Sequence, residues 1–131
     1  MSDRSVLIAD DNTDNRAVYV MMLDHLGYRV LEAANGEEAV RVARAELPDL
    51  ILMDLQMPGT NGFQATEQLK RDDSTARIPI LAITALAMDQ DRELAFAVGC
   101  DEYFAKPIEP RVLADEVRRR IGPAHPAAAS S

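Results

Sequence analysis

The sequence predicts an α/β fold with a parallel sheet, and two patterns lead to this prediction. Short apolar runs alternate along the chain with segments whose apolar residues recur at helical spacing. Such alternation is typical of parallel sheets, because two parallel neighbours need a crossover segment between them. Residues 6–9 and 50–53 are apolar without interruption, as expected for strands that are buried on both faces of a sheet.

Each of five apolar runs predicts one strand. In chain order they are SVLIA at 5–9, YRVLEA at 28–33, LILMD at 50–54, IPILAIT at 78–84 and EYFA at 102–105. Pro79 falls near the start of its run, where a strand tolerates proline. Five strands joined by right-handed crossovers most commonly form a flavodoxin-like sheet of order 2-1-3-4-5 with helices on both faces.

Each run is followed by a segment with the apolar spacing of a helix. Capping and turn residues mark the starts of the first three helices, at 12–15, at Asn35-Gly36 and at 58–62. The apolar positions, in chain order, are Val18, Met21, Met22, Leu23 and Leu26; Ala39, Val40, Ala43 and Leu47; Phe63, Thr66 and Leu69; Leu94, Ala95 and Val98; and Val112, Leu113, Val117 and Ile121. The predicted unit therefore has five strands and five helices.

One domain accounts for the chain, because 131 residues is the size of a single ordinary domain. Residues 1–121 contain all the predicted elements. The remaining segment, GPAHPAAASS at 122–131, is too poor in large apolar residues to join a core. We therefore expect residues 122–131 to be a disordered tail or a linker stub.

Charge and composition exclude several classes of partner. The net charge of −8 disfavours direct binding to nucleic acid or to an anionic membrane surface. No apolar stretch approaches the roughly 20 residues that are needed to span a bilayer. Cys100 is the only cysteine, and the first residues lack the pattern of a signal peptide, so we expect a reducing, cytoplasmic location.

Polar residues stand at the ends of four predicted strands. Asp10 and Asp11 follow the first run, Asp54 ends the third, Thr84 ends the fourth, and Lys106 follows the fifth. A single aspartate at such a position could be a helix cap. Parallel strands, however, place their carboxyl ends at one edge of the sheet, so these groups are expected to converge on one site.

The three carboxylates predict a divalent cation at this edge. At about 5 Å they would repel by roughly 3 kcal/mol per pair at an effective dielectric constant near 20, so they need a cation or shared protons. Oxygen ligands without a nearby histidine or cysteine point to Mg²⁺, for which Mn²⁺ is a possible substitute. The Thr84 hydroxyl and the Lys106 ammonium could bind oxygens of a phosphoryl group on Asp54, so the pattern indicates phosphoryl transfer to a carboxylate.

Four motifs at these positions make the sequence resemble the CheY-like receiver domain of response regulators in two-component signalling. They are IADDN at 8–12, LMDLQMPGTNG at 52–62, AITA at 82–85 and EYFAKP at 102–107, and the resemblance covers about residues 4–121. It implies that Asp54 is the phosphoacceptor and that Lys106 is the lysine of the catalytic set. It also implies that Thr84 is the switch hydroxyl and Tyr103 the switch aromatic residue.

The resemblance implies a ligand set for Mg²⁺ as well. Asp11, Asp54 and the backbone carbonyl of Gln56 would coordinate the ion, whereas Asp10 would act through water. The peptide bond between Lys106 and Pro107 is expected to be cis, as is typical of this motif.

The family's function follows as a further implication. Asp54 would accept a phosphoryl group from a phosphohistidine on a histidine kinase or a histidine phosphotransfer protein, which would dock on exposed apolar residues of the first helix such as Val18 and Met22. Phosphorylation would reshape the surface formed by the fourth helix, the fifth strand and the fifth helix, and so change the affinity for a downstream protein target. The protein would turn over no external substrate, and it would be a monomer or a weak phosphorylation-dependent dimer.

Several alternatives stand beside this interpretation. We expect a stand-alone single-domain regulator, and the alternative is a receiver cut from a larger response regulator or hybrid kinase. A haloacid dehalogenase-type phosphohydrolase would need Asp-x-Asp, but Gln56 stands two residues after Asp54. A receiver-like module that is never phosphorylated would usually have lost a site residue. A flavin-binding protein would need a phosphate-binding loop after the first strand. This chain instead has the acidic segment ADDNTDN at 9–15, which would repel a phosphate.

Overall fold

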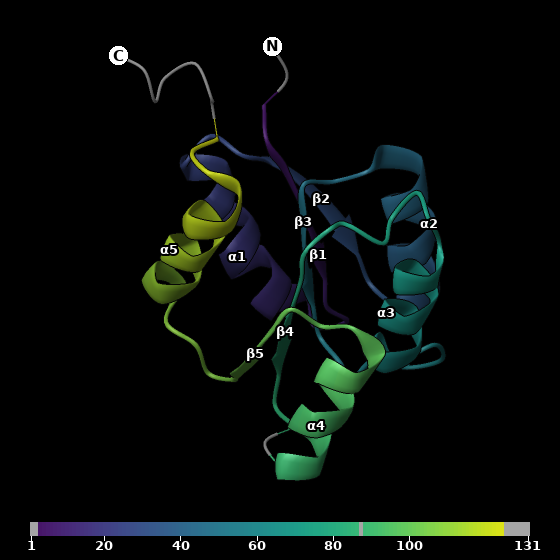
Figure 1. The fold of residues 1–131 in the computed structure, drawn as a ribbon. Helices are drawn as coiled ribbons and strands as arrows, with labels where there is room; N and C mark the ends of the chain where they lie inside the picture. The colour runs from purple at the N-terminus through teal and green to yellow at the C-terminus, as the bar shows by residue number, and fades with distance from the viewer. Residues whose placement is uncertain (1–2, 87, 125–131) are drawn as a thin grey trace.

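The computed structural model describes residues 3–86 and 88–124, and in this part of the chain five strands alternate with five helices (Figure 1). The strands form one parallel sheet of order β2-β1-β3-β4-β5, which confirms the predicted α/β fold and strand order. The strands are β1 (Ser5–Ala9), β2 (Arg29–Ala33), β3 (Leu50–Met53), β4 (Ile80–Thr84) and β5 (Glu102–Ala105).

Helices cover both faces of this sheet. In Figure 1, α1 and α5 lie on one side of the strands, and α2 and α3 lie on the other. No helix within the described residues is long and apolar enough to cross a membrane. The helices are α1 (Thr13–His25), α2 (Gly36–Glu46), α3 (Gly62–Arg71), α4 (Asp89–Val98) and α5 (Pro110–Ile121).

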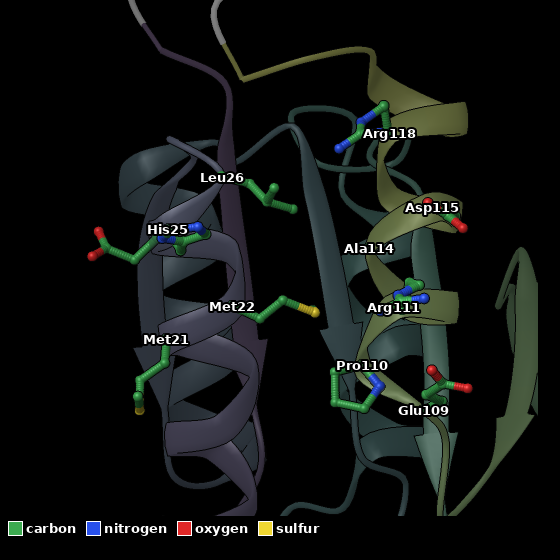
Figure 2. Close-up of a pocket in the computed structure, with 11 residues that line it drawn as sticks. Met21, Met22, His25, Leu26, Glu109, Pro110, Arg111, Ala114, Asp115 and Arg118 are labelled. Carbon is green, nitrogen blue, oxygen red and sulfur yellow. The ribbon is translucent and has the colours of Figure 1, made fainter.

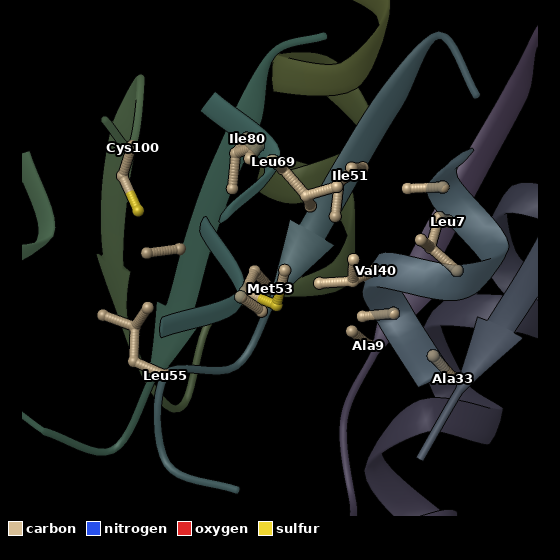
Figure 3. Packing of buried hydrophobic residues seen from close by; sticks show 14 of the residues in the cluster. Leu7, Ala9, Ala33, Val40, Ile51, Met53, Leu55, Leu69, Ile80 and Cys100 are labelled. Atoms are coloured by element: carbon tan, nitrogen blue, oxygen red, sulfur yellow. The ribbon is translucent and has the colours of Figure 1, made fainter. Parts of the chain in front are cut away.

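The sheet separates two hydrophobic cores, because successive side chains of a strand point to opposite faces. Leu7, Ile51 and Met53 belong to the core beneath α2 and α3, which we call the α2/α3 core (Figure 3). Val6 and Ile8 belong to the core beneath α1 and α5, the α1/α5 core. Every residue of β1, β3 and β4 is buried, as predicted for central strands.

The helix starts follow the predicted capping chemistry. Asn12, Asn35 and Asn61 are the N-cap residues of α1, α2 and α3, and each side chain accepts a hydrogen bond from the backbone amide three residues further on. Asn61 also forms a capping box with Gln64, whose side chain accepts from the Asn61 amide. These caps set where the loops at the carboxyl edge of the sheet end.

The fourth strand begins two residues later than predicted. The Ile78 amide donates to the Thr75 carbonyl in a turn, at 3.1 Å, and Pro79 has no amide hydrogen to donate. The ladder therefore begins at Ile80. The sequence pattern suggested an earlier start because Ile78 is itself apolar and buried.

The expectation that nothing beyond residue 121 joins the core is wrong for Ala124. Ala124 is only 4% exposed and packs in the α1/α5 core, and its carbonyl accepts from the Arg4 amide at 2.9 Å. The Tyr28 hydroxyl donates to the Gly122 carbonyl at 2.6 Å. A small alanine and backbone carbonyls leave no apolar pattern, which is why the sequence did not show this. The rest of the predicted tail, residues 125–131, lies outside the described residues.

Leu47 lies at the end of α2 in an unfavourable backbone conformation, not on the helix face that its spacing suggested. Its φ of 47° and ψ of 63° are left-handed, and it is the only non-glycine residue with positive φ among the described residues. Its side chain is 52% exposed, so little packing offsets the strain. Left-handed backbone costs most residues roughly 1–2 kcal/mol, whereas glycine adopts it freely.

We therefore expect Leu47→Gly to be more stable than Leu47→Ala by about 1 kcal/mol in urea unfolding. The alanine variant is the matched control, since it removes the same side chain but keeps the strain. An alanine variant equal to or more stable than the glycine variant would contradict the strain argument.

Candidate functional site

The carboxyl edge of the sheet gathers side chains that follow three different strands, β1, β3 and β5. Backbone hydrogen bonds of the sheet extend one residue past the ends of β3 and β5. The Asp54 amide donates to the Ala9 carbonyl at 2.9 Å, and the Lys106 amide donates to the Thr84 carbonyl at 2.8 Å. Asp10, which follows β1, is fixed in the same way by its neighbour β2, because its amide donates to a β2 carbonyl. The fold thereby brings Asp10, Asp54 and Lys106 to one place.

Lys106 bridges the two buried carboxylates. Its Nζ lies 2.9 Å from Asp10 Oδ2 and 2.9 Å from Asp54 Oδ2. The other oxygens accept from backbone amides, Asp10 Oδ1 from Asn12 at 2.8 Å and Asp54 Oδ1 from Gln56 at 2.9 Å. Both carboxylates are therefore held in fixed orientations, and they share the single positive charge of Lys106.

Burial and pairing act in opposite directions on the acid–base chemistry of this group. Burial raises the pKa of Asp54 by more than the hydrogen bonds from Lys106 and Gln56 lower it, so the carboxyl holds its proton more tightly than usual. Burial lowers the pKa of Lys106, but the hydrogen bonds to Asp54 and Asp10 outweigh it and the net pKa is raised. The lysine therefore remains an ammonium at neutral pH.

Asp11 completes an acidic cluster with Asp10 and Asp54. One carboxylate oxygen from each of the three residues lies within 4.8 Å of the others, and it is the only such group of three or more possible ligands in the described part of the chain. Asp11 is exposed, whereas Asp10 and Asp54 are buried. A donor set made only of oxygens fits Mg²⁺ or Mn²⁺ and is a poor set for zinc or copper.

A cavity of about 500 Å³ opens beside the cluster and has room for a phosphoryl group. Asp54, Asp11 and Lys106 face it. The remaining lining residues are Asn12, Asn15, Gln56, Met57, Pro58 and Ala85. Two of the three clustered carboxylates and the Lys106 ammonium thus share one opening to solvent.

The two predicted switch residues lie behind this cavity and not in it. Thr84 is fully buried, and its hydroxyl accepts only a long hydrogen bond of 3.3 Å from the Leu86 amide. Tyr103 packs against the α2/α3 core, and its hydroxyl is buried without a hydrogen-bond partner among the described residues. The structure brings Asp10, Asp11, Asp54, Gln56 and Lys106 together, and Thr84 and Tyr103 lie outside this group.

Sequence reasoning missed Arg16, which contacts the site from α1. Its Nη1 donates to the backbone carbonyl of Asp10 at 2.6 Å, and its Nε donates to Glu32 Oε1 at 2.9 Å. The contact is to a main-chain atom, so residue types at the strand ends gave no sign of it. A helix that starts at residue 13 does place residue 16 one turn from the loop that carries Asp10.

A larger cavity, of about 1010 Å³, lies between α1 and α5 (Figure 2). None of the clustered carboxylates lines it, and its walls carry Met22, Leu26 and Ala114. On α1, Met21 and Val18 are 72% and 49% exposed, as expected from the long apolar run in that helix. This cavity is larger, but the three clustered carboxylates and Lys106 lie at the smaller one.

Comparison with known proteins identifies the family of this chain. The model of the family described as the response regulator receiver domain matches residues 6–118. The chain belongs to this family. It is therefore a CheY-like receiver domain of two-component signalling, as its motifs suggested.

Named relatives of this receiver domain include both short and long proteins. The polar-differentiation response regulator DivK of Brucella anthropi is 38% identical over 121 residues, which cover 92% of this chain and 98% of DivK. Protein PilH of Pseudomonas aeruginosa is 40% identical over 108 residues, covering 82% of this chain and 89% of PilH. The phosphate regulon transcriptional regulatory protein PhoB of P. aeruginosa is 38% identical over 126 residues, covering 94% of this chain but 55% of PhoB.

Solved structures of other receiver domains share this fold. The receiver domain of a sensor histidine kinase from P. aeruginosa, which has a magnesium ion coordinated in its active site cleft, superposes with a TM-score of 0.85. It is 38% identical, and the match covers 92% of this chain and 99% of that one. The chemotaxis protein CheY4 of Vibrio cholerae gives a TM-score of 0.85 at 28% identity, with 91% and 99% covered.

Proposed function

We propose that this receiver domain is a phosphoacceptor response regulator whose Asp54 accepts a phosphoryl group from a phosphohistidine. The donor would be a sensor histidine kinase or a histidine phosphotransfer protein. The observation that carries the proposal is the placement of Asp54: its carboxylate is buried and held by Lys106, yet it faces the cavity that Asp11 also lines.

The transfer itself needs one bond to form and one to break. A carboxylate oxygen of Asp54 attacks the phosphorus while the bond from phosphorus to the histidine nitrogen breaks, and the imidazole leaves with that electron pair. The product is an acyl phosphate on Asp54. The Lys106 ammonium lies 2.9 Å from the attacking carboxylate, close enough to remain beside the phosphoryl oxygens as their charge develops.

The acidic cluster would hold Mg²⁺, with Mn²⁺ as a substitute. Asp11, Asp54 and the backbone carbonyl of Gln56 are the proposed ligands, and Asp10 would act through water. When bound, the ion supplies positive charge to the transferring phosphoryl oxygens. The oxygen-only donor set supports this assignment, and so does the magnesium ion in the cleft of the related kinase receiver.

Thr84 and Tyr103 are the proposed switch that follows phosphorylation. Thr84 would exchange its long hydrogen bond for one to a phosphoryl oxygen, and Tyr103 would move in response. Two facts support this: the Tyr103 hydroxyl has no partner to lose among the described residues, and α4 has only one buried residue, Ala95. A helix held by so little burial moves at low cost, so the surface of α4, β5 and α5 is the proposed output face for a downstream protein.

The organisation of the whole protein is also a proposal. We infer a stand-alone, cytoplasmic regulator whose receiver domain extends to Ala124, because the match to DivK covers 98% of that protein. It would catalyse only its own phosphorylation and dephosphorylation and be a monomer or a weak dimer, with no direct contact to nucleic acid or membrane. A receiver within a longer response regulator is the second candidate, favoured by the match to PhoB, of which the chain covers 55%.

Intact-mass analysis after incubation with acetyl phosphate tests the proposed function. We expect wild type to gain one phosphoryl group in Mg²⁺ and almost none in excess chelator, and Asp54→Asn to gain none in either. Asp11→Ala should need far more Mg²⁺ for the same labelling. Unlabelled wild type, or labelling that survives Asp54→Asn, would refute the proposal. Steady release of phosphate from small phosphomonoesters would instead favour a phosphohydrolase.

A further inference from the structure

Arg16 makes two hydrogen bonds that no step of phosphoryl transfer explains. It lies in the first turns of α1, its side chain is only 15% exposed, and its guanidinium lies between the end of β1 and the edge strand β2. Nη1 donates to the Asp10 carbonyl at 2.6 Å, and Nε donates to Glu32 Oε1 at 2.9 Å. Its backbone amide donates to the Asn12 carbonyl at 3.0 Å, so both parts of the residue bind the same loop.

The carbonyl that Arg16 binds belongs to the peptide group between Asp10 and Asp11. A peptide group is planar, so a bond to its oxygen fixes the plane and with it the position of the next Cα atom. The last residue of β1 in the ladder is Ala9, so this peptide lies where the sheet no longer holds the chain on both sides. Arg16 supplies a fixed donor at that point.

The two aspartates differ in how much other support they have. The Asp10 carboxylate accepts from the Asn12 amide and from Lys106, at 2.8 and 2.9 Å, and is buried. Asp11 is exposed, so the direction of its carboxylate depends mainly on the backbone that carries it. The hydrogen bond from Arg16 therefore matters most for Asp11.

Glu32 holds the guanidinium in this orientation. An ion pair whose carboxylate side chain is 51% exposed adds little to stability, so its effect is on the direction in which Arg16 points. The flat guanidinium presents donors in fixed directions, which lets one side chain bind a carboxylate and a carbonyl together. Arg16 contacts a backbone carbonyl and none of the clustered carboxylates, so its effect on the cluster comes through the geometry of the main chain.

We propose that Arg16 is a positioning residue for the divalent cation: by holding the carbonyl of the Asp10–Asp11 peptide it aims the Asp11 carboxylate at the space beside Asp54, and Glu32 orients its guanidinium. This inference rests on the proposed Mg²⁺ site. Groups that orient ligands without touching the metal typically contribute 10- to 100-fold to metal affinity, and Arg16 is of this kind.

The test is Mg²⁺ affinity, measured by isothermal titration calorimetry on the full chain. We expect Arg16→Met to bind Mg²⁺ about tenfold more weakly than wild type and Glu32→Gln to show a smaller loss in the same direction. Arg29→Met is the matched control. Like Arg16, Arg29 is paired with a glutamate, Glu46, at 2.7 Å, but it lies in β2 and takes no part in the acidic cluster. It should leave Mg²⁺ affinity unchanged.

Acetyl phosphate labelling separates positioning from catalysis. Because Arg16 touches none of the reacting atoms, the Arg16→Met variant should reach the wild-type labelling rate once Mg²⁺ is saturating. A rate that stays low at saturating Mg²⁺ would make Arg16 catalytic and overturn the positioning role.

If wild type binds Mg²⁺ and Arg16→Met binds it equally well, the inference fails while the proposed function stands. If wild type binds none, the proposed metal site itself fails. Should Arg16→Met not fold, unchanged affinity in Glu32→Gln would overturn the inference.

Discussion

Replacing Lys106 with methionine will slow phosphorylation by acetyl phosphate about 100-fold or more at saturating Mg²⁺, because it removes the fixed charge beside the phosphoryl oxygens. The same change will lower the free energy of unfolding by about 3 kcal/mol near neutral pH, since it leaves two buried carboxylates without their counter-charge. Phosphorylation is read by intact mass, and stability by urea unfolding without Mg²⁺. A variant as stable as wild type at pH 7.5 would show that Lys106 does not compensate Asp10 and Asp54.

The stability of the Lys106→Met variant is expected to fall as pH rises. Burial already raises the pKa of Asp54, and loss of Lys106 will raise it further, so the folded variant binds a proton more tightly than the unfolded chain does. The variant therefore loses stability as pH rises from the unfolded-state pKa of Asp54 to its folded-state pKa. The difference in free energy of unfolding between wild type and variant is smallest in acid and largest near neutral pH. In wild type, the raised pKa of Lys106 means that its contribution persists through neutral pH and is lost only as pH rises through the folded value.

A double variant serves as the control for this electrostatic explanation. Asp54→Asn in the Lys106→Met background removes one of the uncompensated charges, so it should recover a large part of the lost stability without restoring phosphorylation. Failure to recover stability would attribute the loss to packing around the lysine stem instead.

Replacing Gly62 with alanine will destabilise the protein by about 3 kcal/mol, although alanine is ordinarily the better helix residue by about 1 kcal/mol. Gly62 is the first residue of α3 and lies under the segment that carries Asp54. A Cβ atom there would meet the Asp54 carbonyl oxygen and would lie 2.6 Å from the Leu55 Cα atom. Both are backbone atoms, so the segment that carries the proposed phosphoacceptor Asp54 must shift relative to α3, and labelling by acetyl phosphate should fall on the order of 100-fold.

Gly59→Ala is the matched control for this effect. Gly59 is in the same loop with a φ of 69°, but nothing lies within 4 Å of where its Cβ would be. We expect a loss of about 1 kcal/mol from backbone strain alone and nearly normal labelling. Equal effects from the two substitutions would contradict the steric argument at Gly62.

The sequence predicted most of the fold because its local signals agree with one another. The five apolar runs, separated by segments with helical spacing, predicted all five strands. Asn12, Asn35 and Asn61 marked the starts of three helices. Boundaries failed where backbone chemistry decides them, as at Pro79. Docking of Ala124 could not be predicted, because it depends on a small side chain and on a carbonyl that accepts from the amide of Arg4, which is distant in sequence.

The candidate site was predicted through residue types at strand ends, and this succeeded for side chains that meet each other. Asp10, Asp54 and Lys106 bind directly, and their positions at the ends of parallel strands suggested that they converge. Arg16 acts on a main-chain atom and was invisible for that reason. Tyr103 was expected from the resemblance, but its unpartnered hydroxyl could be seen only in the structure.

The two cores on either side of the sheet allow the two faces of the protein to diverge separately. Thr84 continues the row of Ile80 and Ala82, which faces the α2/α3 core, and Tyr103 packs on that side too, whereas α1 packs on the other. Residues in different cores share no side-chain neighbours, so the effects of their substitutions should add nearly independently. Variation on α1 is thus expected to leave Thr84 and Tyr103 undisturbed, whereas α5 shares the α1/α5 core with α1, so that part of the proposed output face is coupled to changes on α1.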